Sequence, residues 1–140
     1  MPSAAAVTAV VADANVLLSA AIGKAALRVL TEHVVAVHTA RFNADEVRRY
    51  LPRLAHRYRL PIDLVELQWH LLPLTVHPHG DYAGELPQAR RELAGRDPDD
   101  AHPLALARRL GIPLWSNDLD LADRGVDCYP TARLLEILAR

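Results

Sequence analysis

The sequence predicts an α/β domain in which a mainly parallel β-sheet is covered on both faces by helices. Short apolar runs rich in β-branched residues, typical of strands buried on both faces, alternate along the chain with longer segments of helical periodicity. Such alternation implies right-handed crossovers between parallel strands. The length of 140 residues suits one domain, which we expect to span residues 1–140.

The composition narrows the classes of function. Sixteen basic and seventeen acidic residues give a net charge of -1, so any contact with nucleic acid must come from a local basic patch. The single cysteine, Cys128, excludes an internal disulfide and a multi-cysteine zinc site, and it fits the reducing cytoplasm, which is the expected location. The apolar stretch 1–18 lacks a basic leader and contains Asp13 and Asn15, which favours a core strand over a signal peptide or a membrane span.

The apolar runs and the helical segments give an expected order of elements. The expected strands are residues 7–12, 34–38, 74–77, 112–115 and 126–129. The expected helices are residues 15–21, 25–32, 43–59, 61–72, 81–94, a helix between the acids near residue 97 and the fourth strand, and 132–139. The helix 61–72 is apolar on more than one stripe, which predicts burial on two sides or contact with a partner.

Several residues predict where helices begin. Thr39 and Asn43 are candidate N-caps of the third helix, and Asn43 has capping-box spacing with Glu46. Thr131 is expected to cap the last helix.

Prolines suggest further boundaries. Pro52 predicts a kink or break in the third helix. The helix after the acids begins either at Pro98 or nearer Pro103.

Two acids follow predicted strands. Asp13 comes directly after the first strand, and Asp118 follows the fourth. Because the carboxyl ends of parallel strands meet at one edge of a sheet, we expect both side chains there. A helix N-cap at Asp13 and a plain turn at Asp118 are the ordinary alternatives.

The segment 96–120 supplies more acids. Asp97 precedes a proline, as an ordinary N-cap does. On a continuous helix Asp100 shares a stripe with Leu104 and Ala107, and an acid facing a core needs a partner. Asp120 is expected to be a second cap or an outer support. Carboxylates crowded in this way repel one another, which indicates a bound cation.

One face of the third helix combines an acid with basic residues. The basic residues are Arg49, Arg53 and Arg57, and Tyr50 and Tyr58 lie among them. Such a mixture of basic and aromatic residues predicts a track for a polynucleotide backbone. A solvated helix face and a capping box are the alternatives for the basic residues and the acid. At spacings of i, i+3, i+7 and i+11, the residues of this face are Glu46, Arg49, Arg53 and Arg57.

Other kinds of site lack their patterns. Gly23-Lys24 does not have the glycine spacing of a phosphate loop. His77 and His79 are not spaced for zinc on one helix face. A phosphate-accepting receiver domain needs a lysine after a late strand, and Lys24 is the only lysine.

Four short motifs occur in order along the chain. They are VVADANVLLSA at Asp13, ADEV at Glu46, DPDDAHPLALA with its last acid at Asp100, and WSNDLDL at Asp118. In this order and spacing they resemble the PIN domains, a family of metal-dependent ribonucleases that includes the toxins of VapBC toxin–antitoxin pairs. The resemblance covers nearly the whole chain. It implies a three-layer αβα sandwich with a central, mainly parallel sheet of about five strands.

The resemblance also implies a metal site. Asp97 is an additional acid near it, and Asn15 and Ser116 occupy polar positions that support it. Because the usual surface lysines of the family are absent, arginines must supply the phosphate contacts. The expected ions are Mg²⁺ or Mn²⁺, and the expected ligands, which are also the catalytic residues, are Asp13, Glu46, Asp100 and Asp118.

The expected function is hydrolysis of RNA phosphodiester bonds by a metal-dependent endoribonuclease, as a VapBC-type toxin or as a stand-alone nuclease. The expected partners are RNA, a cognate antitoxin and a second copy of the chain, the last two through the apolar face of Leu64, Leu67 and Leu71. The alternative is a catalytically weak PIN-like module that binds RNA or protein. The number of metals and the choice between RNA and DNA stay open.

Overall fold

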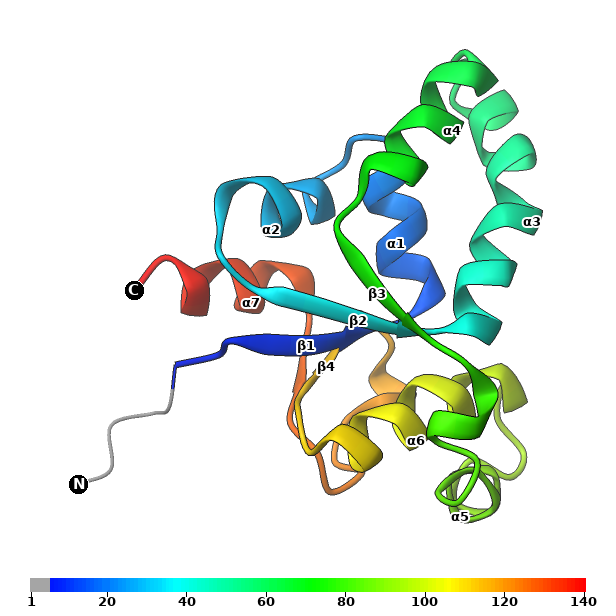
Figure 1. Cartoon of the computed structure of the whole chain (residues 1–140), viewed down its shortest axis with the longest axis vertical. Helices are drawn as coiled ribbons and strands as arrows, with labels where there is room; N and C mark the ends of the chain where they lie inside the picture. The colour runs from blue at the N-terminus through cyan, green and yellow to red at the C-terminus, as the bar shows by residue number, and fades with distance from the viewer. Residues whose placement is uncertain (1–5) are drawn as a thin grey trace.

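The computed structural model describes residues 6–140, in which five strands form one sheet of order β3-β2-β1-β4-β5 (Figure 1). All four neighbouring pairs are parallel, which confirms the predicted fold class. The first five residues of the expected 1–140 domain lie outside the described part. The strands are β1 (Ala9–Ala12), β2 (Ala36–Ala40), β3 (Leu74–His77), β4 (Leu114–Trp115) and β5 (Cys128–Tyr129).

Helices cover both faces of the sheet, as predicted. Figure 1 shows α1, α2, α3, α4 and α7 on one side and α5 and α6 on the other, and each side has its own apolar core. The described residues form seven α-helices: α1 (Ala14–Ala21), α2 (Ala26–Glu32), α3 (Arg41–Arg57), α4 (Ile62–Leu71), α5 (Leu86–Glu92), α6 (Ala101–Leu110) and α7 (Thr131–Leu138). Short 3₁₀ turns are η1 (His79–Asp81), η2 (Pro98–Asp100) and η3 (Leu119–Leu121).

The strand order reverses beside β1. From β1 the chain builds outward through β2 to β3, and the later strands β4 and β5 are added on the other side. Ala12 pairs with Trp115, so the residues that follow these two strands emerge next to each other. In an open α/β sheet, such a switch point is where ligands bind.

The start of α3 corrects the predicted caps. Strand β2 ends at Ala40, two residues later than predicted, because Thr39 and Ala40 pair with Val76 and His77 of β3. Thr39 therefore lies in the strand, where its hydroxyl donates to the carbonyl of Ala12 at 3.1 Å. Helix α3 begins at Arg41 without a side-chain cap.

Two predictions about proline have different outcomes. Helix α3 continues through the exposed Pro52, so the predicted break is absent. Helix α6 begins at Ala101, between the two predicted starts, after the 3₁₀ turn η2. Pro103 lies in the first turn of α6, where a backbone N–H has no intrahelical partner, so the helix accommodates it.

The bounds of two other helices, α5 and α7, also differ from those predicted. The predicted helix 81–94 is shorter, since α5 covers only Leu86–Glu92. Helix α7 begins at Thr131 itself, whose hydroxyl accepts a hydrogen bond from Trp115 Nε1 at 2.9 Å. The backbone N–H of Thr131 donates to Asn117 Oδ1, also at 2.9 Å. The side chain that bonds the first turn of α7 is therefore that of Asn117, and not that of Thr131 as predicted.

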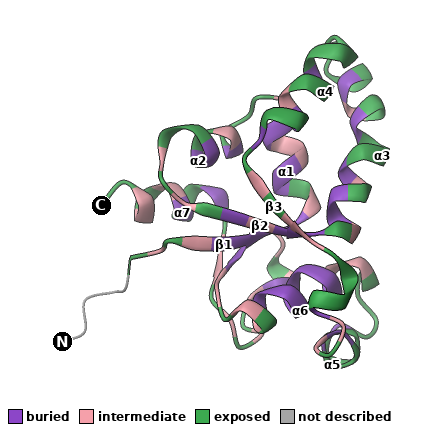
Figure 2. Cartoon of the chain, in the orientation of Figure 1, coloured by how far each residue is buried: buried purple, intermediate pink, exposed green. Residues whose placement is uncertain are grey.

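Helix α4 is not buried on two sides. Only Val65 and Trp69 face the core, and the outer surface of α4 is exposed in Figure 2. Among residues 6–140, no single helix has the length and apolar composition needed to cross a membrane. Helices α1 and α2 have this length and composition only when they are counted together, as a pair bent by 76°, and both helices pack in the core.

Candidate metal centre

Asp13 is fixed at the carboxyl end of β1. It is buried, it caps α1 by accepting from the N–H of Val16 at 3.0 Å, and its second oxygen accepts from the hydroxyl of Ser116. Burial raises the pKa of Asp13, and the charge of Asp118 raises it further. The residue is therefore both the predicted cap and part of an acidic group.

Ser116 joins the two strand ends. While its hydroxyl donates to Asp13, it accepts from the N–H of Asp118 at 3.0 Å. Asp118 in turn caps η3, accepting from the N–H of Asp120 at 2.9 Å. The carboxylates that follow β1 and β4 are therefore positioned through one buried hydroxyl.

Asp100 lies opposite these strand ends at the start of α6. Burial raises its pKa to about 8, and the nearby carboxylates of Asp118, Asp97 and Asp13 add to this shift. Its Oδ2 is buried and has no hydrogen-bond partner among the described residues. A carboxylate left unsatisfied among other carboxylates favours a cation.

Glu46 enters from α3. Its Oε1 accepts from Asn43 Nδ2 at 2.8 Å, so this pair does not form the predicted capping box but an internal contact of the helix. Burial raises the pKa of Glu46 to about 6, and the charges of Asp99 and Asp97 contribute. Asn43 is itself buried, and its Oδ1 also has no partner in the described part of the chain.

A cleft of about 200 Å³ brings most of these groups together. Asp97 caps η2 through the N–H of Asp99 at 3.0 Å, as its ordinary interpretation predicts, yet it also faces the cleft. Asp99 and Asn43 were not assigned to the site from the sequence, although Asn43 lies only one helical turn before Glu46. The cleft is lined by Asp13, Ala14, Asn15, Asn43, Glu46, Tyr50, Asp97, Asp99 and Asp100.

Asp120 extends the acidic group outward. Carboxylate oxygens of Asp100, Asp118 and Asp120 all lie within 4.8 Å of one another. Asp120 also forms an ion pair with Arg96, which precedes the acids of η2. Asp120 is therefore close enough to Asp100 and Asp118 to share an ion with them, and its supporting role stays a prediction.

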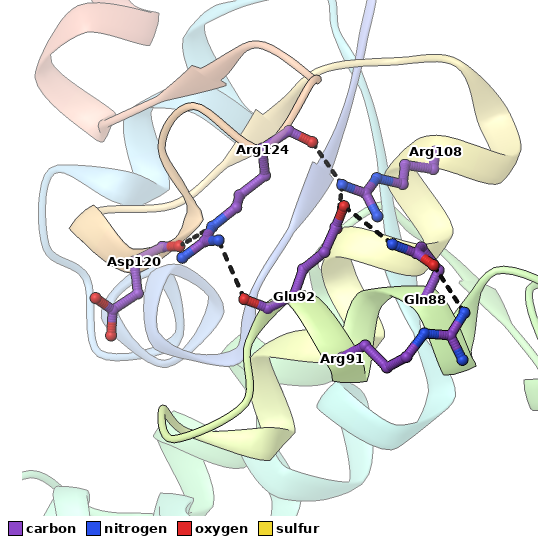
Figure 3. Close-up of polar contacts among 6 residues, drawn as sticks. All are labelled: Gln88, Arg91, Glu92, Arg108, Asp120 and Arg124. Atoms are coloured by element: carbon purple, nitrogen blue, oxygen red, sulfur yellow. Dashed lines mark hydrogen bonds and ion pairs between the residues drawn. The ribbon is translucent and has the colours of Figure 1, made fainter.

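An arginine network fixes the loop that carries Asp118 and Asp120 (Figure 3). Arg124 donates to the carbonyl of Asp120 at 2.9 Å and to the carbonyl of Glu92 at 3.1 Å. Arg108 of α6 donates to the carbonyl of Arg124 at 2.6 Å and pairs with the carboxylate of Glu92. The loop after β4 is thus tied to both α5 and α6.

The predicted arginine face lies beside the acidic cleft. Arg53 and Arg57 line a groove of about 270 Å³, which shares Asn15 and Tyr50 with the cleft. The guanidinium groups of Arg49 and Arg53 lie 5.8 and 5.7 Å from the ring centre of Tyr50. The arginines are exposed, as a solvated helix face also requires.

The donor set fits a hard divalent cation. Every side chain that lines the cleft except that of Ala14 carries an oxygen, and two buried oxygens, Asp100 Oδ2 and Asn43 Oδ1, lack partners within residues 6–140. Oxygen ligands with carboxylates are the set that Mg²⁺ and Mn²⁺ prefer.

A family model described as PIN domain matches residues 11–139. The chain belongs to the PIN-domain family. The match spans every residue that lines the acidic cleft. Among curated protein sequences, none matches the chain.

Solved structures support the same fold. PAE2754 from Pyrobaculum aerophilum has a TM-score of 0.66 at 16% identity, and the match covers 99% of this chain and 100% of that one. A toxin–antitoxin complex from Klebsiella pneumoniae has a TM-score of 0.61 at 19% identity, with 83% and 92% covered. VapC20 of Mycobacterium tuberculosis, a toxin that cleaves the sarcin–ricin loop, has a TM-score of 0.57 at 20% identity, with 84% and 95% covered.

Proposed function

We propose that this PIN domain is a metal-dependent endoribonuclease that hydrolyses RNA phosphodiester bonds. The observation that carries the proposal is Asp100, a carboxylate with one buried and unpaired oxygen among the charges of Asp13, Asp97 and Asp118. Such an arrangement is unfavourable in the free protein and favourable around a cation. Membership of the PIN-domain family supports this class of reaction.

We assign Mg²⁺ or Mn²⁺ to this centre. An ion held by the residues of this centre would supply positive charge that stabilises the developing charge on the phosphate and that lowers the pKa of a bound water. The ligands in this proposal are Asp13, Glu46, Asp100 and Asp118, and the additional acid Asp97 lines the same cleft. Asn15 lines the cleft, and Ser116 bonds both the carboxylate of Asp13 and the backbone N–H of Asp118.

Glu46 is suited to proton transfer. Its Oε1 is held by Asn43, which leaves Oε2 available to accept a proton from the attacking water. In the metal-free protein the pKa of Glu46 is raised to about 6, so its carboxyl group is largely ionised at neutral pH, the form that binds a cation or accepts a proton. In this proposal Glu46 is a catalytic residue and a ligand of the ion, and it would receive the proton when its carboxylate is not bound to the ion.

The RNA backbone would follow the arginine face of α3. Arg53, Arg57 and Tyr50 line a groove that shares Asn15 and Tyr50 with the acidic cleft, and Arg49 also lies near the Tyr50 ring. Guanidinium groups pair with phosphates, and an exposed aromatic ring offers a stacking surface for a base.

An antitoxin or a second copy of the chain is the proposed protein partner. Structural neighbours include a toxin–antitoxin complex, although their low identity supports only the fold. In this chain, Leu64, Leu67 and Leu71 are 62%, 53% and 67% exposed on the outer face of α4. An apolar face of this kind favours a protein partner.

The experiment compares cleavage of single-stranded RNA, and of DNA of the same sequence, in Mn²⁺, Mg²⁺ and EDTA. We expect cleavage of RNA only with metal, and its loss in Asp13→Asn and Asp118→Asn. Asp63→Asn, an exposed acid of α4, is the matched control and should keep full activity. Full activity in EDTA with folding intact would refute the proposal.

The same proteins separate the nuclease from the binding module. If the acidic cleft is a real site, millimolar Mn²⁺ raises the melting temperature of the parent chain and not that of Asp13→Asn. RNA binding without any metal-induced change in melting temperature would identify a module that binds RNA and does not cleave it.

A further inference from the structure

Two histidines meet on the sheet away from the acidic cleft. His38 lies on β2 and His77 at the end of the neighbouring strand β3, and Ala40 is the residue paired directly with His77. The two imidazoles are therefore diagonal neighbours, and both lie on the sheet face opposite Val37. His38 Nδ1 is 2.8 Å from His77 Nε2, and neither residue lines the cleft.

Asp81 orients the second ring. Its Oδ2 lies 3.0 Å from His77 Nδ1. A carboxylate only accepts hydrogen bonds, so His77 carries its proton on Nδ1 and presents the Nε2 lone pair to His38. His38 then donates from Nδ1. The tautomers of both rings are therefore fixed by one carboxylate.

Burial favours the neutral form of His38, and the ring of His77 is partly shielded from solvent. Burial lowers the pKa of His38, and His77 lowers it further. The side chain of His77 is only 14% exposed, while that of Asp81 is 49% exposed. Neutral imidazole is the form that binds metal, and a histidine backed by a carboxylate is the usual arrangement at such sites.

The kind of donor favours particular metals. The facing atoms, 2.8 Å apart and joined by a hydrogen bond, are both imidazole nitrogens. Imidazole suits the late first-row divalent ions, and a site with given donors generally binds Cu²⁺ more tightly than Ni²⁺ or Zn²⁺.

We propose that His38 and His77 form a second metal site, a two-histidine site for Cu²⁺ or Ni²⁺ that links β2 to β3. The ion replaces the proton shared between the rings. His38 moves its proton from Nδ1 to Nε2, so both facing nitrogens become ligands and no proton leaves the protein. Asp81 keeps its bond to His77 Nδ1, and water completes the coordination.

The test uses the full chain without an affinity tag, because a tag would bind the same metals. Cu²⁺ and Ni²⁺ are titrated into the parent protein and into Asp100→Asn, which weakens the acidic centre. We expect both proteins to contain the same histidine site, with the same affinity for Cu²⁺. His38→Ala and His77→Ala should each weaken Cu²⁺ binding at least about tenfold, and Asp81→Asn, which alters only the outer contact, by about tenfold.

A matched control and a spectroscopic readout make the result decisive. His70→Ala removes an exposed histidine of α4 and should leave binding unchanged. Electron paramagnetic resonance of the Cu²⁺ protein should show two nitrogen ligands, with one lost in His38→Ala. If His77→Ala misfolds, His77→Asn replaces it. Unchanged binding in both histidine variants, loss of binding in His70→Ala, or no binding at all would overturn the inference and leave the pair as a plain hydrogen bond between strands.

Because this site shares no residue with the acidic cleft, its failure would say nothing about the proposed nuclease. Equally, loss of RNA cleavage in Asp13→Asn would leave the Cu²⁺ titration unchanged.

Discussion

Replacing Asp100 with asparagine tests how much the repulsion among the crowded acids destabilises the folded protein. The substitution keeps the shape of the side chain, removes one negative charge and supplies an N–H that can donate to Asp118. In the folded, metal-free protein the pKa of Asp100 is raised from 3.8 to about 8 by burial and by Asp118, Asp97 and Asp13. Without metal, the folded state therefore loses stability as pH rises from about 4 to about 8, because the unfolded chain ionises first.

The expected magnitude is moderate. A shift of one pKa unit corresponds to about 1.4 kcal/mol, but Asp100 is only half-buried, so screening by solvent leaves roughly 1–3 kcal/mol in total. For a domain of this size, that corresponds to a rise in melting temperature of roughly 3–9 °C in Asp100→Asn at high pH. At about pH 4 the parent carboxyl is protonated when folded, and the difference between the proteins should largely vanish.

The assay is thermal unfolding of both proteins in EDTA at several pH values, followed by titration with Mn²⁺. Asp100→Asn should melt higher than the parent in EDTA at about pH 8, and it should lose most of the Mn²⁺-induced rise. A variant that melts lower than the parent at every pH, or that keeps the full response to Mn²⁺, would show that Asp100 is an ordinary structural acid.

Three further predictions concern the surroundings of the cleft. Arg124→Ala removes two hydrogen bonds to carbonyls, so it should lower the free energy of unfolding by about 1–3 kcal/mol and weaken Mn²⁺ binding, both measurable by calorimetry. Trp115→Phe leaves the buried hydroxyl of Thr131 without its donor and should cost about 1–3 kcal/mol in urea unfolding. Arg53→Gln should weaken RNA binding in EDTA and reduce its salt slope by about 1, whereas Arg48→Gln, an equal change of charge on another face of α3, should not.

The fold and the central acids were predictable because local patterns carry them. The apolar run before Asp13 places that residue at a strand end, and the run before Ser116 does the same for Asp118. Parallel pairing then brings the two ends together. The ligand role of these acids remains a prediction, since proximity alone does not identify a bound ion.

The errors arose where distant pairing decides local structure. Strand β2 extends to Ala40 because β3 pairs with its last residues, and no local signal near Thr39 shows this. Asn117 Oδ1 accepts from the backbone N–H of Thr131, which lies 14 positions later in the chain. Local sequence does not reveal this contact, so Thr131 was predicted as the cap of the last helix. The meeting of His38 and His77 depends on the register of two strands, which spacing along the chain does not reveal.

The position of β4 has a consequence for synthesis of the protein. This strand lies between β1 and β5, although it is made about a hundred residues after β1. A chain still growing on the ribosome therefore has Asp13 and Glu46 but not Asp118, and β1 is still an edge strand of its sheet. If the acids act together on RNA, the nascent chain cannot cut the ribosome that makes it or the message that encodes it. Activity would begin only when the last quarter of the chain has folded into the first.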